Sequence, residues 1–339
     1  MRRTDNPQNR FEAQSVEWLE EPPYALLEVH EERSKSIISA NDSPDIPFRY
    51  SVNPYRGCYH GCWYCYARPS HQYWGFGAGT DFERKIIVKT NAAELLRERF
   101  DQVAWSGDPI TFSGNTDCYQ PLEAAWRLTR ACLSVCAEYQ NPVAIITKSA
   151  LVQRDLDVLC ELNERARLRV YISIPFANDA KARLVEPGAS APSKRFAALA
   201  TLSAAGIETG IAVAPIIVGL NDPDIPELLS RARDAGAKHA FKTALRLPAE
   251  VLPVFESRLA QTFPDAAGKV MSAVVQIRRG KKNESAFGDR MRGCGPRWQV
   301  VEDLFNLHCQ RLGFNDDERE TFYDLPTTFR RPYGQLSLF

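Results

Sequence analysis

The sequence predicts an α/β fold built around a parallel sheet. From about Phe48 to Phe263, short apolar segments typical of strands alternate with amphipathic segments typical of helices. Six such strand–helix units follow one another, and this alternation favours parallel strands with helices packed outside them. The pattern leaves two closures open, a doubly wound open sheet and an incomplete β/α barrel.

The expected strands are short, apolar and bounded by turn-forming residues. They span residues 48–53, 109–114, 143–147, 168–174, 207–215 and 238–245. The expected helices carry apolar residues at helical spacing, with Pro in the first turn of one and Gly at the end of another. They span residues 91–105, 121–139, 151–165, 193–206, 224–236 and 248–263. In either closure the functional loops gather at the C-terminal ends of the strands.

Composition divides the chain into four parts. Residues 1–46 are rich in charge and turn formers, so we expect an irregular N-terminal arm. Residues 47–264 form the core of strand–helix units. Residues 265–334 form a C-terminal extension with a basic loop and one helix, which could face the substrate. Residues 335–339 form a short apolar tail.

The charge balance gives no global basic field that would argue for nucleic acid, because Lys+Arg and Asp+Glu number 42 each. A local basic run, Arg278, Arg279, Lys281 and Lys282, could still meet phosphate, although such a run is usually a solvated face. Neither a signal peptide nor a membrane span is recognisable, so we expect a cytoplasmic protein. In that compartment the nine cysteines are expected to be free, metal-bound or catalytic.

Three of these cysteines lie within eight residues. Cys58, Cys62 and Cys65 have the spacing C-x3-C-x2-C in "RGCYHGCWYCYARP", directly after the first expected strand. Three thiolates on one tight loop can converge on a metal centre. His60 could complete a four-ligand zinc site. A [4Fe–4S] cluster usually has four cysteine ligands, so three would leave one iron open for chemistry.

This cysteine motif, at the first loop of such a core, resembles the radical S-adenosylmethionine (SAM) superfamily over roughly residues 48–263. The resemblance implies a partial (β/α)6 TIM-like barrel in which Cys58, Cys62 and Cys65 bind a [4Fe–4S] cluster. It also implies that SAM chelates the fourth iron and is cleaved to a 5′-deoxyadenosyl radical, which abstracts hydrogen from the substrate. An electron donor such as flavodoxin or ferredoxin would reduce the cluster.

Within that superfamily, "GCWYCY" resembles the family of spore photoproduct lyase. The resemblance implies that Tyr64 and Tyr66 take part in radical transfer, and that Tyr64 lies where the family contacts adenine. The lyase also uses a cysteine after the second strand as a hydrogen-atom donor. A rough alignment puts that donor nearer Gly114 than Cys118, so Cys118 matches only approximately. Cys294 is the other thiol that we consider, and both have a plain interpretation as small packed residues.

The same resemblance suggests residues that bind SAM. Ser113, Asn115, Thr116 and Asp117 follow the second expected strand, where the superfamily holds the methionine amino group; a polar turn is the alternative. Lys148 and Ser173 end the third and fourth strands, and a cation and a hydroxyl suit the methionine carboxylate. The list of more distant pocket candidates comprises Arg195, Asn221 and Asp222, for which structural caps are an equal alternative.

The chain ends in "QLSLF", Gln335 to Phe339. This pentapeptide resembles the motif by which bacterial polymerases and repair factors bind the DNA sliding clamp. Gln335 would hydrogen-bond at the edge of the clamp pocket, and Leu338 and Phe339 would fill it. The alternative is a tail that packs on its own domain.

Together these features predict a radical SAM enzyme that acts on DNA, either in photoproduct-lyase-like repair or in base modification. One rival is a radical SAM enzyme that modifies RNA, a protein or a metabolite. The other is a non-catalytic metal-binding adaptor at the replication clamp.

Overall fold

The six predicted strands form one sheet in the computed structural model, which describes residues 5–11, 25–316 and 322–332. The parallel strands are β3 (Tyr50–Val52), β6 (Ile110–Phe112), β7 (Val143–Thr147), β8 (Leu168–Ser173), β9 (Glu208–Ile216) and β10 (His239–Ala244). They lie in that order, and the arm strand β2 (Ile38–Ala40) pairs antiparallel with β3 at the edge. Within the described residues β10 and β2 do not pair, so the sheet is an open, partial barrel rather than a closed one.

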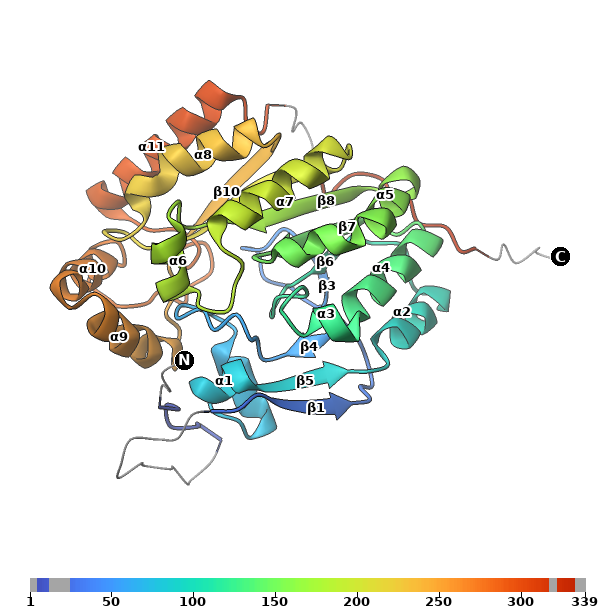
Figure 1. Ribbon diagram of the computed structural model, residues 1–339, viewed down its shortest axis with the longest axis horizontal. Helices are drawn as coiled ribbons and strands as arrows, with labels where there is room; N and C mark the ends of the chain where they lie inside the picture. Colours follow the sequence, from blue (N-terminus) through green and yellow to red (C-terminus); the bar gives the residue numbers. More distant parts are fainter. Residues whose placement is uncertain (1–4, 12–24, 317–321, 333–339) are drawn as a thin grey trace, which may run out of the picture.

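Helices follow the strands around the outside of this sheet (Figure 1). They are α2 (Ala92–Asp101), α3 (Glu123–Trp126), α4 (Leu128–Glu138), α5 (Leu156–Arg165), α6 (Asp179–Val185), α7 (Pro192–Ala204), α8 (Ile225–Asp234) and α9 (Val251–Thr262). Two further helices belong to the C-terminal extension, α10 (Pro264–Gln276) beside α9 and α11 (Gly295–Leu312) beside α8. The predicted alternation is therefore confirmed, because each parallel strand is followed by helical structure before the next.

Local details differ from the sequence expectations. The helix expected over 121–139 is broken into α3 and α4 at Arg127, whose φ is +52°. The helix expected over 151–165 begins as the 3-10 turn η2 (Ala150–Asp155). The expected irregular N-terminal arm contains β2 and β1 (Glu28–Glu32), so part of it is regular.

Strand β1 belongs to a second, small sheet that the sequence pattern did not predict. It pairs parallel with β5 (Lys85–Lys89), and β5 pairs antiparallel with β4 (Tyr55–Arg56). Between β4 and β5 the chain forms the cysteine loop, the 3-10 turn η1 (Arg68–Trp74) and the short helix α1 (Thr80–Arg84). The cysteine loop therefore leaves from and returns to two paired strands of this small sheet.

The C-terminal segment crosses the N-terminal ends of the strands, the end opposite the cysteine loop. The Arg167 Nη2 donates to the Leu325 carbonyl at 3.1 Å, just before β8. The Thr328 hydroxyl donates to the carbonyl of Gln140, just before β7. The Arg331 guanidinium donates to carbonyls around the end of α2. The chain thus leaves the described structure at the base of the barrel, and the clamp-like motif Gln335–Phe339 lies outside the described residues.

Among the helices that the structure describes, none is both long enough and apolar enough to cross a bilayer.

Candidate active site

The cysteine loop is fixed by backbone geometry before any side chain contributes. Gly57 has φ +72°, and a Cβ there would lie 3.0 Å from the carbonyl oxygens of Phe82 and Lys85. The next residue, Cys58, donates its amide to the Phe82 carbonyl at 2.9 Å. The chain can make this close, left-handed turn into the loop because Gly has no side chain.

The three cysteines share one buried region. Cys58 and Cys62 are each 6% exposed, and Cys65 packs beside both of them. Burial raises the pKa of all three thiols, and neighbouring negative groups and the other thiols add to the effect at Cys58 and Cys62. Thiolates in such a place need a positively charged partner, which iron supplies. The residues present therefore fit an iron–sulfur cluster.

Within the described residues, no three His, Cys, Asp or Glu side chains converge closely enough to share a single metal ion. A [4Fe–4S] cluster does not require such convergence, because each cysteine binds an iron of its own. His60, considered as a fourth ligand, instead lies with its Nδ1 3.4 Å from the Asp117 carboxylate.

A buried triad locks the loop from the α6–α7 side. The Tyr64 hydroxyl donates to the Glu186 carboxylate, and Glu186 forms an ion pair with Arg195 at 2.6 Å. Both members of the ion pair are fully enclosed. Arg195 also donates to the Ser173 and Ser190 carbonyls. These bonds engage the Arg195 guanidinium, as the structural alternative for this residue predicts.

The backbone of the α6–α7 connection also contacts the cysteine loop directly. The Trp63 amide donates to the Val185 carbonyl at 3.2 Å, and the Gly188 amide donates to the His60 carbonyl at 2.8 Å. A Cβ on Gly188 would lie 2.1 Å from the Tyr59 carbonyl oxygen, so only glycine fits there. The sequence offered no signal for this contact, because 128 residues separate Gly188 from His60.

A second buried ion network joins the loop to α1 and α9. Arg68 donates to the Cys62 carbonyl at 2.9 Å and pairs with Glu83, and Arg258 of α9 pairs with the same carboxylate at 2.9 Å. Arg258 also reaches the Gly61 carbonyl at 3.5 Å. The cysteine loop is therefore tied to both α1 and α9.

The segment after β6, proposed to bind SAM, is mostly occupied by internal bonds. Ser113 accepts the Cys118 amide, and Thr116 donates to the Tyr55 carbonyl. Asp117 accepts from the Thr147 hydroxyl at 2.7 Å and the Lys148 amide at 2.8 Å. The Asn115 side-chain amide donates to the Ser70 hydroxyl at 3.2 Å, and its Oδ1 accepts from no donor among the described residues.

Lys148 and Ser173 differ in availability. The Lys148 ammonium lies 5.7 Å from the centre of the Tyr64 ring and forms no ion pair with any residue that the structure describes. Its charge opposes protonation of His60 and favours ionisation of Cys62, so it is close to the cysteine loop. Ser173 instead donates its hydroxyl to the Ala214 carbonyl at 3.2 Å.

Of the two thiols considered as hydrogen-atom donors, one is buried in the core and the other donates to a backbone carbonyl. Cys118 is fully buried in the main core, and burial raises the pKa of its thiol. The Cys294 thiol donates to the Ile277 carbonyl at 3.4 Å, within the C-terminal extension. Of the more distant candidates, Asn221 accepts from the Ile217 amide and donates to the Pro175 carbonyl, and Asp222 accepts from the Gly219 amide at 2.6 Å.

Tyr66 is the side chain of the motif that faces outward. It follows Cys65, is 47% exposed, and donates its hydroxyl to the Gly114 carbonyl at 2.9 Å. The guanidinium of Arg246, just beyond the end of β10, lies 5.9 Å from the centre of its ring. Tyr66 therefore connects the cysteine loop to the loops that follow β6 and β10. We call this end of the barrel, at the C-terminal ends of the strands, its mouth.

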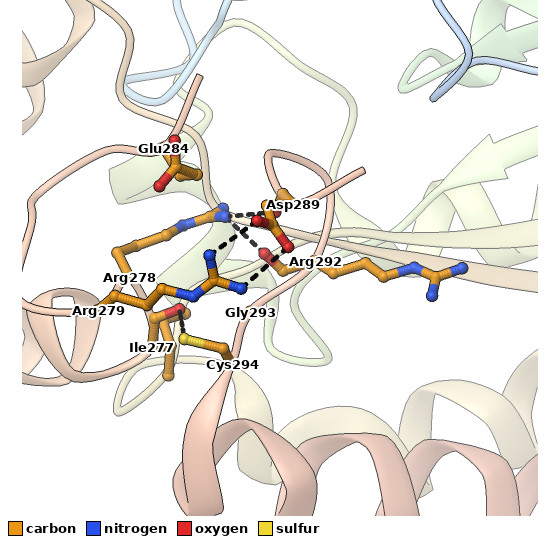
Figure 2. Close-up of a pocket in the computed structure, with 8 residues that line it drawn as sticks. All are labelled: Ile277, Arg278, Arg279, Glu284, Asp289, Arg292, Gly293 and Cys294. Atoms are coloured by element: carbon orange, nitrogen blue, oxygen red, sulfur yellow. Dashed lines mark hydrogen bonds and ion pairs between the residues drawn. The ribbon is translucent and has the colours of Figure 1, made fainter. Parts of the chain in front are cut away.

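The basic run near residue 280 does not present four free cations. Arg278 is 2% exposed and donates to the Leu245, Asp289 and Arg292 carbonyls. Arg279 pairs with Asp289, and Figure 2 shows both arginines turned toward that residue. The two lysines also pair with acidic residues, Lys281 with Glu284 and Lys282 with Glu256. The solvated or structural interpretation therefore holds for this run.

Comparison with known proteins identifies the class to which this site belongs. The family model described as the radical SAM superfamily matches residues 52–232, which include the cysteine motif and the strands through β9. The chain belongs to the radical SAM superfamily. Enzymes of this superfamily use a [4Fe–4S] cluster and SAM, so the predicted enzyme class and cofactors are confirmed.

Related sequences and structures extend this assignment. A protein of uncharacterised function from Mycobacterium tuberculosis is 33% identical over 251 residues, covering 73% of this chain and 74% of that protein. An uncharacterised protein from Methanocaldococcus jannaschii is 29% identical over 58% of this chain and 70% of its own length. A cysteine-to-serine mutant of spore photoproduct lyase has a similar structure, with a TM-score of 0.59, 18% identity, and coverage of 84% of this chain and 80% of that chain. This likeness shows the fold.

Proposed function

We propose that this radical SAM enzyme acts on DNA, at a damaged or modified base. The proposal is supported by the shared fold with spore photoproduct lyase, one structure of which is complexed with a dinucleoside spore photoproduct. The cytoplasm would be its location. The reaction would be lyase-like repair or base modification.

The residues of this chain would divide the cofactor work among them. Cys58, Cys62 and Cys65 would hold the cluster, which, with SAM bound, supplies a 5′-deoxyadenosyl radical. Lys148 would bind the SAM carboxylate, because its ammonium has no acidic partner in the described structure. Asn115 would offer its free carbonyl oxygen to the SAM amino group. Tyr64, held by Glu186, would form a fixed wall beside the adenosine.

The observation that carries the proposal is the position of Tyr66. It is half exposed, follows the third cysteine, and is oriented by its bond to Gly114. A phenol so placed can donate a hydrogen atom to a substrate radical at the barrel mouth. Ser113, Thr116, Asp117 and Ser173 would support the pocket through the bonds described above, and Cys118 would serve as donor only if the core around it opened.

The decisive experiment uses reconstituted enzyme under anaerobic conditions with SAM and dithionite. The assay measures 5′-deoxyadenosine with and without ultraviolet-irradiated DNA, and then analyses the DNA for altered bases. Formation of 5′-deoxyadenosine that increases with irradiated DNA, together with a changed base, is the expected result. Formation that is indifferent to DNA would favour the rival substrates, RNA, a protein or a metabolite.

A second element of the proposal concerns recruitment. Gln335–Phe339 would bind the bacterial sliding clamp, and the segment before it is anchored at the base of the barrel by Thr328 and Arg331. Clamp and substrate would then approach opposite ends of the enzyme. A pull-down with the clamp, repeated after deletion of the last five residues, tests this: retention by the full chain alone is expected, and equal retention of both forms would refute it.

A further inference from the structure

The mouth of the barrel carries an arginine whose donors are largely unused. Arg246 follows β10 by two residues, and its Nη1 makes a weak contact with the Met291 sulfur at 3.5 Å. Its Nε is buried without a hydrogen-bond partner, and it forms no ion pair within the described part of the chain. A partly buried guanidinium without an acceptor is costly unless a ligand supplies one.

The acidic groups around Arg246 are already engaged. Asp45 of the arm accepts from the Arg290 side chain and, at 2.6 Å, from the Gly288 amide. On the strap, Asp289 is taken up by Arg279 at 2.9 Å, and the carboxylate that acts on Arg246 is that of Asp45. Burial, and after it the positive charge of Arg290, lowers the pKa of Arg246. Two neighbouring guanidinium groups with one shared carboxylate leave a local excess of positive charge.

The segment that carries Arg290, residues 277–294, is held across the end of β10; we call it the strap. The Ala244 amide donates to the Met291 carbonyl at 3.0 Å, and the Leu247 amide donates to Asn283 at 3.0 Å. The Arg278 Nη2 donates to the Leu245 carbonyl at 2.6 Å. The strap is therefore a fixed rim of the mouth, joined at its other side to the arm through Asp45.

Aromatic rings flank the two guanidinium groups. Phe287 of the strap is 62% exposed, and the Arg290 guanidinium lies 4.6 Å from the centre of its ring. At the other side, Arg246 lies 5.9 Å from the centre of the Tyr66 ring. The exposed Phe287 ring on this fixed loop provides a flat apolar face. Each guanidinium lies against an aromatic ring, so the two rings and the two charges form one row.

We propose that this row, Tyr66, Arg246, Arg290 and Phe287, binds a single strand or an extruded nucleotide of nucleic acid. Arg246 binds a phosphate with its free donors, and Phe287 stacks on a neighbouring base. The site rests on the proposed function, whose substrate class it sharpens to an unstacked nucleotide beside the cysteine loop. Unstacking is the general requirement for chemistry on a base that a duplex would hide.

The test measures binding of a short fluorescein-labelled oligothymidylate to the reconstituted holoenzyme by fluorescence anisotropy across a salt series. Arg246→Gln is expected to weaken binding about tenfold and to reduce the salt slope by about 0.7, the value for one phosphate on a single strand. Phe287→Ala is expected to weaken binding about tenfold with an unchanged salt slope, because stacking involves no counterion.

The matched control is Arg292→Gln, which removes one positive charge from the strap rather than from the end of β10. The Arg292 side chain is exposed and turns away from Arg278 and Arg279 in Figure 2. Less than a twofold loss is expected. Equal losses in Arg246→Gln and Arg292→Gln would mean diffuse attraction and overturn the site.

A second readout separates this site from the cofactor site. Formation of 5′-deoxyadenosine from SAM and dithionite without nucleic acid should be unchanged in Arg246→Gln. Its loss would assign Arg246 to SAM and overturn the inference. If the wild type cleaves SAM but does not bind the oligonucleotide, this inference fails while radical chemistry stands. If the oligonucleotide binds as expected but DNA is never altered, the proposed function fails and the binding site stands.

Discussion

The cysteine loop and the strap form two sides of the same mouth, and they differ in how far their charged side chains are paired. Around the loop, buried charges are paired: Glu186 with Arg195, and Glu83 with both Arg68 and Arg258. Along the strap side, Arg246 keeps unused donors and Phe287 an exposed ring. A reactive cofactor needs a rigid, satisfied surrounding, whereas a substrate site needs groups that are satisfied only when the substrate arrives.

The largest expected effect comes from breaking the loop side at its centre. Cys62→Ala should abolish both iron binding and 5′-deoxyadenosine formation, because a cluster ligand is lost. Iron content and visible absorption of the anaerobically purified protein measure the first, and chromatography measures the second. Cys136→Ala is the control: its thiol is buried in the core on α4, so iron content should stay at the wild-type level. Full iron in Cys62→Ala would exclude this residue as a ligand.

The next test removes one member of the enclosed ion pair. Glu186→Gln leaves the Arg195 guanidinium buried without its counter-charge, so the free energy of unfolding should fall by about 3 kcal/mol. Anaerobic urea unfolding measures it. Arg97→Gln breaks a pair with Glu138 that is far more exposed and should cost less than about 1 kcal/mol. If both variants lost equal stability, burial would not distinguish the two pairs.

A pH experiment probes the packing below the loop. His71 is 1% exposed between Phe76 and Phe82, and burial lowers its pKa from 6.5 to about 4. Below pH 6.5 the unfolded chain gains a proton that the folded imidazole refuses, so stability falls as the pH drops toward 4. Between pH 7 and pH 5 this contributes about 2 kcal/mol of lost stability.

His71→Gln cannot titrate in this range and should show a correspondingly flatter pH dependence of urea unfolding. Parallel curves for the wild type and His71→Gln would contradict the buried, neutral state of this histidine.

The smallest effect concerns Lys148, a charged side chain on the loop side that forms no ion pair with any described residue. Lys148→Met should raise the apparent Kd for SAM about tenfold, the cost of one charge-assisted bond. Equilibrium binding to the reconstituted protein measures it, with iron content as the check that the cluster is intact. Lys282→Met, at an exposed pair with Glu256, is the control. Unchanged SAM affinity in Lys148→Met would remove this residue from the cofactor site.

Several elements could be predicted from the sequence because their causes are local. The strand Val143–Thr147 is an unbroken apolar run, and the structure has it with the same bounds. The cysteine motif and its place after the first strand indicated the enzyme class, which the family match confirms. Strand β1 gave no such signal, because it is a polar segment that becomes a strand by pairing with β5. Helix α10 was missed although its buried residues Val270, Ala273 and Val274 have helical spacing.

The sequence by itself determined the order of strands and helices and the three-thiol motif, because periodicity and spacing are properties of neighbouring residues. Only the tertiary structure decided which charged groups are used and which are free. Arg278 belongs to a basic run that the sequence suggested could meet phosphate, but in the structure it donates to backbone carbonyls. Arg246 belongs to no motif, yet it lies at the mouth with a buried Nε that has no hydrogen-bond partner. The physical reason is that a charge finds its partners through space, as Arg290 does with Asp45, which lies 245 positions away along the chain.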